Sequence, residues 1–316
     1  MVENTEPFVD SSFQVKANTV STKLHDIPGY STMTHPNLNA SPNTLIETAE
    51  LQTLIDQKSG GANVLLVDLG SKNNYQDGHI PGALHCEYRE LISGIKPATG
   101  KIPSEENLSA LFSRLGITSN HRVIAYDHEN GAQASRLLWS LDMVGHHNWS
   151  LLNGGYEAWI SENRAIENMP SIPTPSDFKI SEFSDFRADV AYILERLANP
   201  DTIILDARTP EEHRGEKSPS ARNGRIPGSV NLNWLDTIDF DNYRRLKPHT
   251  TLLSMLAIKG IHPHQEIIAH CQTHQRSSHS YVMLKSLGFE NIKGYDGSWS
   301  EWGNRSDLPI EPEAER

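Results

Sequence analysis

The sequence contains one pattern twice, and this repetition limits the folds that the chain can adopt. Segments of the first half recur in the same order in the second, at offsets between 138 and 146 residues. The clearest pairs are VLLVDL with TIILDA, DGHIPGALH with NGRIPGSVN, and LLNGGYEAW with GYDGSWSEW, the last placing Trp159 opposite Trp302. The main insertion, about eight residues, falls in EEHRGEKSPSARNG of the second half. An ordered duplication of this length predicts two domains with the same fold.

Each half alternates short apolar runs with segments of helical spacing. The strand candidates are rich in β-branched and aliphatic residues, and they lie at 64–69, 122–127, 202–207 and 266–271. Amphipathic segments at 135–145 and 277–288 end at Gly145 and Gly288, as helices often do. This alternation predicts an α/β fold of two tandem domains, each with a mainly parallel central sheet flanked by helices.

Composition divides the chain into four parts. Residues 1–40 have little periodicity and are expected to be a poorly structured arm. The first domain is expected at 41–165 and the second at 185–316. Between them, 166–184 contains three prolines and little periodicity, which is typical of a linker.

Charge and cysteine content exclude several classes of function. The formal net charge is −12, so nucleic acids and anionic membranes would repel the protein, and we expect neither as a partner. No segment approaches the ~20 consecutive apolar residues of a membrane helix, and the acidic N-terminus does not resemble a secretory signal. Two cysteines in unrelated contexts do not suggest a disulfide framework. We therefore expect a cytoplasmic protein.

Cys271 lies at the junction of a predicted strand and a predicted helix. Open α/β sheets place ligand sites at this edge, and the amides of a helix N-terminus stabilise a thiolate. Cys86 has no cationic or helix-start context and is expected to be a buried hydrophobic residue. The nearby histidines raise the alternative of a zinc site, but no second cysteine pair or paired histidine spacing completes four ligands. We therefore expect no metal. We expect the nearby histidines to titrate near physiological pH, namely His262, His264, His270, His274 and His279.

The motifs, taken together, resemble those of tandem rhodanese-type sulfurtransferases. The similarity rests on GHIPGA at 78–83, on Asp127 in the position that matches Cys271, and on the six-residue loop CQTHQR. It implies two rhodanese-like domains, the first non-catalytic and the second carrying sulfur as a persulfide on Cys271. The loop has the spacing Cys-x4-Arg, whereas similar cell-cycle phosphatases have one more residue to admit phosphate. The spacing therefore favours sulfur transfer, with Arg276 as a second catalytic residue.

The resemblance also implies a donor and a set of binding residues. A polar, cationic loop favours thiosulfate as donor, with cyanide or a thiol as acceptor. Arg214 is the preferred donor contact among Arg208, Arg214, Arg222 and Arg225, although the family's arginine position falls nearer Glu212. His274 replaces a glycine that is common in the family. The other expected substrate contacts are in the loop, namely Gln272, Thr273, His274, Gln275 and Ser277, and the expected supporting residues are Asp206 and Trp299.

Two alternatives remain open from the sequence. The protein could be a 3-mercaptopyruvate sulfurtransferase, although those enzymes usually have a small loop without the arginine. It could also be a non-catalytic sulfur-carrier or regulatory module, and the intact Cys271–Arg276 loop favours the enzyme over this alternative. We expect no cofactor and a monomer, with thioredoxin or another thiol protein as a candidate partner.

Overall fold

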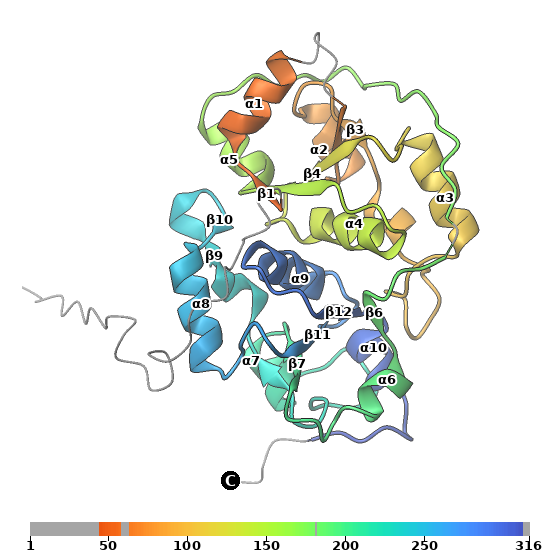
Figure 1. Cartoon of the computed structure of the whole chain (residues 1–316), viewed down its shortest axis with the longest axis vertical. Coiled ribbons are helices and arrows are strands. Elements are labelled where there is room, and N and C mark those ends of the chain that lie inside the picture. The colour runs from red at the N-terminus through yellow and green to blue at the C-terminus, as the bar shows by residue number, and fades with distance from the viewer. Residues whose placement is uncertain (1–43, 58–62, 181, 312–316) are drawn as a thin grey trace, which may run out of the picture. The chain divides into compact units, whose positions relative to one another are not determined.

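The computed structural model describes residues 44–57, 63–180 and 182–311 (Figure 1). The N-terminal arm expected at 1–40 lies outside these described residues. Within them, no helix is long and apolar enough to cross a membrane.

The first half forms a five-stranded sheet with the order β1-β5-β4-β2-β3. All of its neighbouring strands are parallel. Its strands are β1 (Leu45–Ile46), β2 (Val64–Asp68), β3 (Leu84–His85), β4 (Arg122–Tyr126) and β5 (Trp149–Leu152). Side chains alternate across the sheet: Leu65 and Val67 of β2 enter one apolar cluster, and Leu66 enters another on the opposite face.

The second half repeats this topology in the order β6-β12-β11-β7-β8, again with parallel neighbours. Its strands are β6 (Arg187–Ala188), β7 (Thr202–Asp206), β8 (Val230–Asn231), β11 (Glu266–His270) and β12 (Ile292–Tyr295). A separate antiparallel pair, β9 (Ile238–Asp239) and β10 (Arg245–Leu246), belongs to this half alone within the described part of the chain. The predicted fold class is confirmed, since both sheets have the same strand order.

Helices cover both faces of each sheet. In the first half they are α1 (Thr48–Asp56), α2 (Lys72–Asp77), α3 (Glu105–Arg114), α4 (Ala132–Met143) and α5 (Gly155–Ser161), with the 3₁₀ turn η3 (Tyr88–Leu91). In the second half they are α6 (Val190–Leu194), α7 (Pro210–Arg214), α8 (His249–Ile258), α9 (Arg276–Ser286) and α10 (Ser298–Trp302), with the 3₁₀ turns η4 (Trp234–Thr237) and η5 (Phe240–Asn242). The glycines after α4 and α9 have φ of 78° and 82°, as expected of residues that end a helix.

The α4 and α9 helices pack against each other between the two sheets (Figure 1). The sequence indicates amphipathic segments at both places, and the structure encloses these helices on all sides. Nearly every residue of the two helices is buried, including Ser140 and Ser280. Each helix covers its own sheet on one side and the partner helix on the other, so little of either surface remains for water. One apolar cluster consequently runs through both halves.

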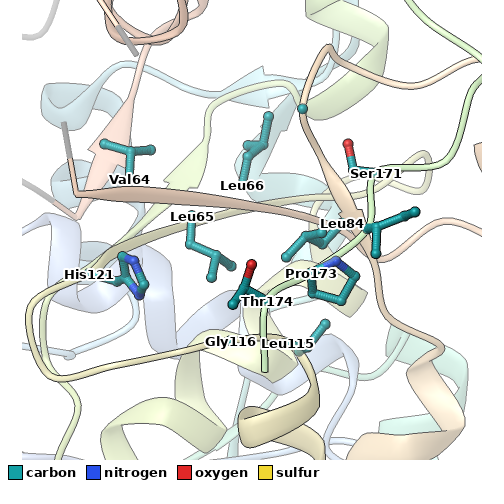
Figure 2. Close-up of a pocket in the computed structure, with 12 residues that line it drawn as sticks. Val64, Leu65, Leu66, Leu84, Leu115, Gly116, His121, Ser171, Pro173 and Thr174 are labelled. Atoms are coloured by element: carbon teal, nitrogen blue, oxygen red, sulfur yellow. The ribbon is translucent and has the colours of Figure 1, made fainter. Parts of the chain in front are cut away.

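The segment between the halves packs on the first sheet instead of crossing solvent. Phe178 contacts Phe112 of α3 edge-to-face at 5.3 Å, and the amide of Ser176 donates to the carbonyl of Ser113. Residues 171–174 also line a cavity of about 340 Å³ beside β2 (Figure 2). Among the described residues, those that line this cavity belong to the first half and this segment, so the cavity is separate from the Cys271 loop.

The buried carboxylate of Asp142 on α4 connects the two halves. It accepts hydrogen bonds from Trp149 Nε1 (2.9 Å) and His147 Nδ1 (2.7 Å) of its own half. From α9 it accepts hydrogen bonds from Tyr281 Oη (2.8 Å) and Lys285 Nζ (2.6 Å). Burial alone would raise the pKa of Asp142, but these donors and the Lys285 charge hold it below the usual range. The interface between the helices therefore depends on a charged group that is fully paired.

Replacing Asp142 with alanine should destabilise the whole protein. The substitution leaves Lys285 and Tyr281 without their buried acceptor, so we expect a loss of about 3 kcal/mol in the free energy of unfolding. Urea unfolding followed by tryptophan fluorescence measures it. Asp177→Ala is the control, because its partner Lys179 is exposed and the loss should stay below about 1 kcal/mol. Equal midpoints for the two variants would contradict the role of Asp142.

Candidate active site

Cys271 directly follows the last residue of β11, a central strand, and precedes α9 by a short loop. Its side chain is free of disulfides and only 1% exposed. The neighbouring strand β7 ends at Asp206, which lies opposite His270 in the parallel register. Cys271 therefore occupies the carboxyl edge of the sheet, where parallel α/β folds assemble their sites.

The turn that begins α10 fixes the backbone of the cysteine loop. The amide of Trp299 donates to the carbonyl of Cys271 (2.9 Å), and the amide of Ser300 donates to that of Gln272 (2.9 Å). The amide of Cys271 donates to Ser298 Oγ at 3.2 Å. Trp299 is itself fully buried, with its indole N–H on Ser218 Oγ. Its structural contribution here comes from the backbone amide and from packing.

The sulfur of Cys271 faces several donors. Burial is the largest influence and by itself raises the pKa of the thiol. The charge of Arg276, the hydroxyl and amide of Ser277 and the amide of Thr273 act in the opposite direction, and together they hold the pKa of Cys271 below its usual value. The site thus favours the thiolate, the nucleophilic form of cysteine.

Arg276 forms a bidentate ion pair with Glu212 of α7. The distances are 2.7 Å from Nη1 to Oε2 and 2.9 Å from Nη2 to Oε1. Burial alone would lower the pKa of Arg276, but Glu212 and the Cys271 thiolate raise it above the usual value. The sequence did not identify Glu212 as a site residue. Glu212 stands where the family's arginine was expected. An acidic residue in place of a basic one was therefore the sequence signal that could have identified it as a site residue.

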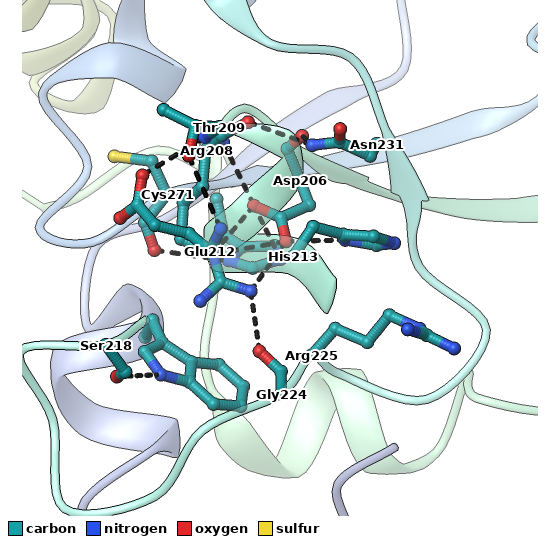
Figure 3. Close-up of polar contacts among 12 residues, drawn as sticks. Asp206, Arg208, Thr209, Glu212, His213, Ser218, Gly224, Arg225, Asn231 and Cys271 are labelled. Carbon is teal, nitrogen blue, oxygen red and sulfur yellow. Dashed lines mark hydrogen bonds and ion pairs between the residues drawn. The ribbon is translucent and has the colours of Figure 1, made fainter. Parts of the chain in front are cut away.

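A second ion pair lies next to the first, within the fully buried core of the site. Asp206 accepts hydrogen bonds from Arg208 Nη2 (2.7 Å) and His213 Nδ1 (2.8 Å), as Figure 3 shows. Asp206 Oδ1 also accepts the amide of Arg208 and so organises the loop after β7. Burial raises the pKa of Asp206, but the charge that His270 gains in acid, the hydrogen bonds from His213 and Arg208 and the charge of Arg208 outweigh it and keep the carboxyl ionised. Asp206 thus lies where a supporting residue was expected.

The four arginines considered from the sequence occupy different environments. Arg208 is the buried partner of Asp206, Arg222 donates to the carbonyls of Trp302 and Leu308, and Arg225 pairs with Glu311. Arg214 is partly exposed and pairs with Glu216 at 2.7 Å. Glu212, two residues before it, is the residue of α7 that contacts the cysteine loop through Arg276.

The middle of the loop adopts a left-handed conformation at His274, with φ of 58°. The loop thus requires a positive φ at a position that glycine would fill without strain. His274 is fully buried, its Nδ1 lies 2.8 Å from Ser277 Oγ, and its ring meets Trp139 edge-on at 4.5 Å. When the single hydroxyl proton of Ser277 points to the Cys271 sulfur, His274 Nδ1 must carry the proton that it shares with Ser277.

The remaining loop residues serve the loop itself. Gln272 Nε2 donates to Ser220 Oγ at 3.1 Å, and Gln275 is the residue before the first turn of α9, its carbonyl accepting the amide of Ser278. The structure thus brings together Cys271 and the loop residues to Ser277. Asp206 contacts Arg208 and His213, and Trp299 contacts Ser218.

The expectation that the nearby histidines titrate near pH 7 is wrong for the three buried ones. Burial lowers the pKa of His270 and of His279 to about 4, and it lowers that of His274 well below its usual value. All three are neutral at physiological pH, because the interior cannot solvate an imidazolium. His262 and His264 stack on each other at 5.9 Å before β11, at the opposite end of that strand from Cys271.

Within the described residues, no three His, Cys, Asp or Glu side chains gather as a metal site requires. Cys86 is fully buried, and burial raises the pKa of its thiol far above the usual value. Its chemistry is therefore that of an inert core thiol.

The Asp127 loop of the first half is the counterpart of the Cys271 loop, and it encloses a carboxylate. Asp127 Oδ1 accepts the amides of Glu129 (2.7 Å) and Gly131 (2.8 Å), and Oδ2 accepts those of Gln133 (2.8 Å) and Ala134 (2.9 Å). Burial raises the pKa of Asp127, and these four amides oppose that rise. The turn into α4 thus encloses an anion supplied by its own chain.

Comparisons with known proteins agree with this architecture. The family model for the rhodanese-like domain matches residues 48–162 and 189–305. A thiosulfate sulfurtransferase of Azotobacter vinelandii is 40% identical over 86% of this chain and 98% of its own length. A 3-mercaptopyruvate sulfurtransferase of Escherichia coli K12 is 28% identical over 78% of this chain and 87% of its own. An anaerobic ergothioneine biosynthesis enzyme from Chlorobium limicola superposes with a TM-score of 0.78 at 23% identity, covering 86% of this chain and 71% of that one, and this likeness concerns the fold alone.

Arg276 should control how readily Cys271 ionises. In Arg276→Met the midpoint of the pH dependence of iodoacetamide alkylation should move up by about one to two pH units, because the thiolate loses its nearest cation. Alkylation rates followed by mass spectrometry across pH measure this, and Arg225→Met is the control. A midpoint unchanged in Arg276→Met would show that the amides alone set the pKa of Cys271.

Proposed function

The chain belongs to the rhodanese-like domain family, and on this basis we propose that it is a thiosulfate sulfurtransferase that carries sulfur as a persulfide on Cys271. The observation that carries the proposal is the environment of the Cys271 sulfur, which combines Arg276 with the donors of Thr273 and Ser277 at the end of β11. Identity of 40% to a thiosulfate sulfurtransferase along nearly all of that enzyme supports it.

The reaction proceeds in two half-reactions. The Cys271 thiolate attacks the outer sulfur of thiosulfate; the S–S bond of the donor breaks, sulfite leaves with the electron pair, and a Cys271 persulfide anion remains. A thiophilic acceptor, cyanide or a thiol, then attacks the outer sulfur and restores the thiolate. Because sulfite leaves as an anion, no protonated group is needed to assist its departure. Kinetics should be ping-pong.

Electrostatics explains why the loop contains a cation. A thiolate must approach a dianion, and two unit charges 4 Å apart repel by about 4 kcal/mol at an effective dielectric constant of 20. Amides directed at the sulfur and the guanidinium of Arg276 oppose this repulsion in the same place where charge accumulates.

The duplicated loop supports the persulfide. In Asp127 the carboxylate oxygens are three bonds from Cα, the same separation as the outer sulfur of a cysteine persulfide. Four amides enclose those oxygens. The corresponding turn before α9 offers amides around Cys271, so the anionic outer sulfur would lie where the first half holds its carboxylate.

3-Mercaptopyruvate is the second candidate donor, and the 28% identical relative from E. coli favours it. Arg276 favours thiosulfate instead, because a dianion gains more from a guanidinium than the monoanionic mercaptopyruvate does. Gln272, Thr273, His274, Gln275 and Ser277 are the proposed loop contacts of the donor, together with Arg214. Acceptors would include a small thiol or a thiol protein such as thioredoxin. We also propose that the protein acts as a monomer. We place it in the reducing cytoplasm, because the reaction requires a free thiol at position 271.

Cys271→Ser should abolish sulfur loading. After incubation with thiosulfate the wild-type mass should rise by about 32 Da, one sulfur atom, and cyanide should remove this gain as thiocyanate. Intact-mass spectrometry and a thiocyanate assay measure the two steps. Cys86→Ser is the matched control, because Cys86 is the other free thiol, and it should load normally. Absence of any adduct in the wild type with every donor would exclude the proposed activity and favour a non-catalytic module.

Donor preference should follow charge. The wild type should have a higher kcat/KM with thiosulfate than with 3-mercaptopyruvate. Arg276→Ala should lower the thiosulfate value by about 10- to 100-fold through loss of a charged hydrogen bond. Arg214→Gln should raise KM for thiosulfate if Arg214 contacts the donor. Steady-state kinetics with both donors decides, and a preference for 3-mercaptopyruvate would reassign the substrate.

A further inference from the structure

Arg136 on α4 belongs to the half that does not carry Cys271, yet its surroundings are those of a ligand-binding residue. Its side chain is fully buried. Nη2 donates to the carbonyls of Leu91 (3.1 Å) and Gly100 (2.8 Å). Nε and Nη1 have no hydrogen-bond partner among the described residues. A buried guanidinium with unused donors is costly unless an anion completes it.

Two contacts place Arg136 beside the cysteine loop. Gly100, whose carbonyl it binds, approaches the loop so closely that an added Cβ would overlap the carbonyl oxygen of Thr273. The guanidinium also lies over the ring of Trp139, 4.7 Å from its centre, and that ring meets His274 at 4.5 Å. Arg136 is thus held against the loop through both Thr273 and His274. Consistent with this position, the charge of the Cys271 thiolate acts on Arg136.

The other buried cations of the site are already neutralised. Arg276 has Glu212 and Arg208 has Asp206, each at 2.7 Å. Arg136 has no carboxylate within ion-pair distance among the described residues; Asp296, whose charge acts on it, accepts the amide of Ile102 and pairs with Arg187. The charge of Arg136 is therefore open to a bound anion without competition from a paired carboxylate.

Tyr88 of η3 offers a second unused donor at the same place. Its hydroxyl is buried without a hydrogen-bond partner in the described part of the chain. The side chain of Thr273 lies within reach to donate to the Tyr88 oxygen, a contact that leaves the Tyr88 proton unused, and the charges of Arg136 and Cys271 both act on Tyr88. The Tyr88 proton and the Nε and Nη1 donors of Arg136, which are unused within the described residues, are suitable donors for the oxygens of an oxyanion.

The internal duplication provides a comparison. At the corresponding positions of the second half, His279 of α9 and Trp234 of η4 contact each other at 5.4 Å, and His279 adjoins Gly131 of the Asp127 loop. The α4 helix thus directs Arg136 to the cysteine loop of the second half, and α9 directs His279 to the Asp127 loop of the first half. The loop filled by a carboxylate receives a neutral histidine, and the loop that must accept an external anion receives an arginine.

We propose that Arg136, assisted by the Tyr88 hydroxyl, binds the sulfonate oxygens of a dianionic sulfur donor while Cys271 attacks its outer sulfur. This inference rests on the proposed function and names a donor-binding role for the half that does not carry Cys271. During transfer the sulfonate takes the electron pair of the breaking S–S bond and leaves as the sulfite dianion, so the same contacts hold donor and leaving group. Arg136 forms no covalent bond and transfers no proton.

The test uses a matched pair of donors in the full-length protein. Thiosulfate is a dianion, and methanethiosulfonate replaces one sulfonate oxygen with a methyl group and has one charge less. Arg136→Met should lower kcat/KM about 30- to 100-fold with thiosulfate, as expected for a charged hydrogen bond, and no more than about fivefold with methanethiosulfonate. Tyr88→Phe, which removes only the hydroxyl, should lower the thiosulfate value about three- to tenfold.

His279→Gln is the control for packing, because it alters the equivalent buried position on the other helix. It should leave the ratio of the two kcat/KM values unchanged. If Arg136→Met fails to fold, Arg136→Lys and Tyr88→Phe decide, and each should shift the ratio against thiosulfate. Equal losses with both donors, or no shift in these two variants, would overturn the role of Arg136. A wild type that loads no sulfur from either donor would instead refute the proposed function.

Discussion

The structure depends on one interaction that both halves use, a buried anion enclosed by the amides of a turn between a strand and a helix. Four amides satisfy the carboxylate of Asp127, and the same turn before α9 surrounds the sulfur of Cys271. Amides at a helix N-terminus have no partners within the helix, so an anion there satisfies them and gains from their aligned dipoles. The two halves differ in the source of the anion. In the first half the anion is the carboxylate of Asp127, and in the second half it is the reactive sulfur of Cys271.

The pairing of α4 with α9 turns two similar domains into one site. Because both helices are buried between the sheets, residues on α4 reach the loop that precedes α9. Burial requires the polar groups on these helices to be paired, and Asp142 shows how fully this can be done. Arg136 and Tyr88 depart from that rule, with donors that have no partner in the described residues. Unsatisfied donors of this kind beside the cysteine loop indicate where a ligand would lie.

Charge in the site is arranged locally, against the acidic average of the chain. Arg276 and Arg208 are each neutralised by a carboxylate, and the buried histidines are uncharged at neutral pH. The ionisation of Cys271 therefore responds to fixed groups and not to histidine titration. Arg276 keeps its charge across the physiological range of pH, because guanidinium groups do not lose their protons there.

The sequence by itself determined the duplication, the parallel α/β architecture and the position of Cys271, since these follow from local patterns: apolar runs, helix-ending glycines and a cysteine between strand and helix. Only the tertiary structure decided which distant side chains meet. Glu212 pairs with Arg276 across 64 positions, and Arg136 reaches the loop from the other half. The neutral state of His274 and the all-round burial of α9 were likewise outside the reach of the sequence. Both depend on how much water remains around a side chain after the two sheets have packed on either side of it. The spacing of residues along the sequence does not specify this.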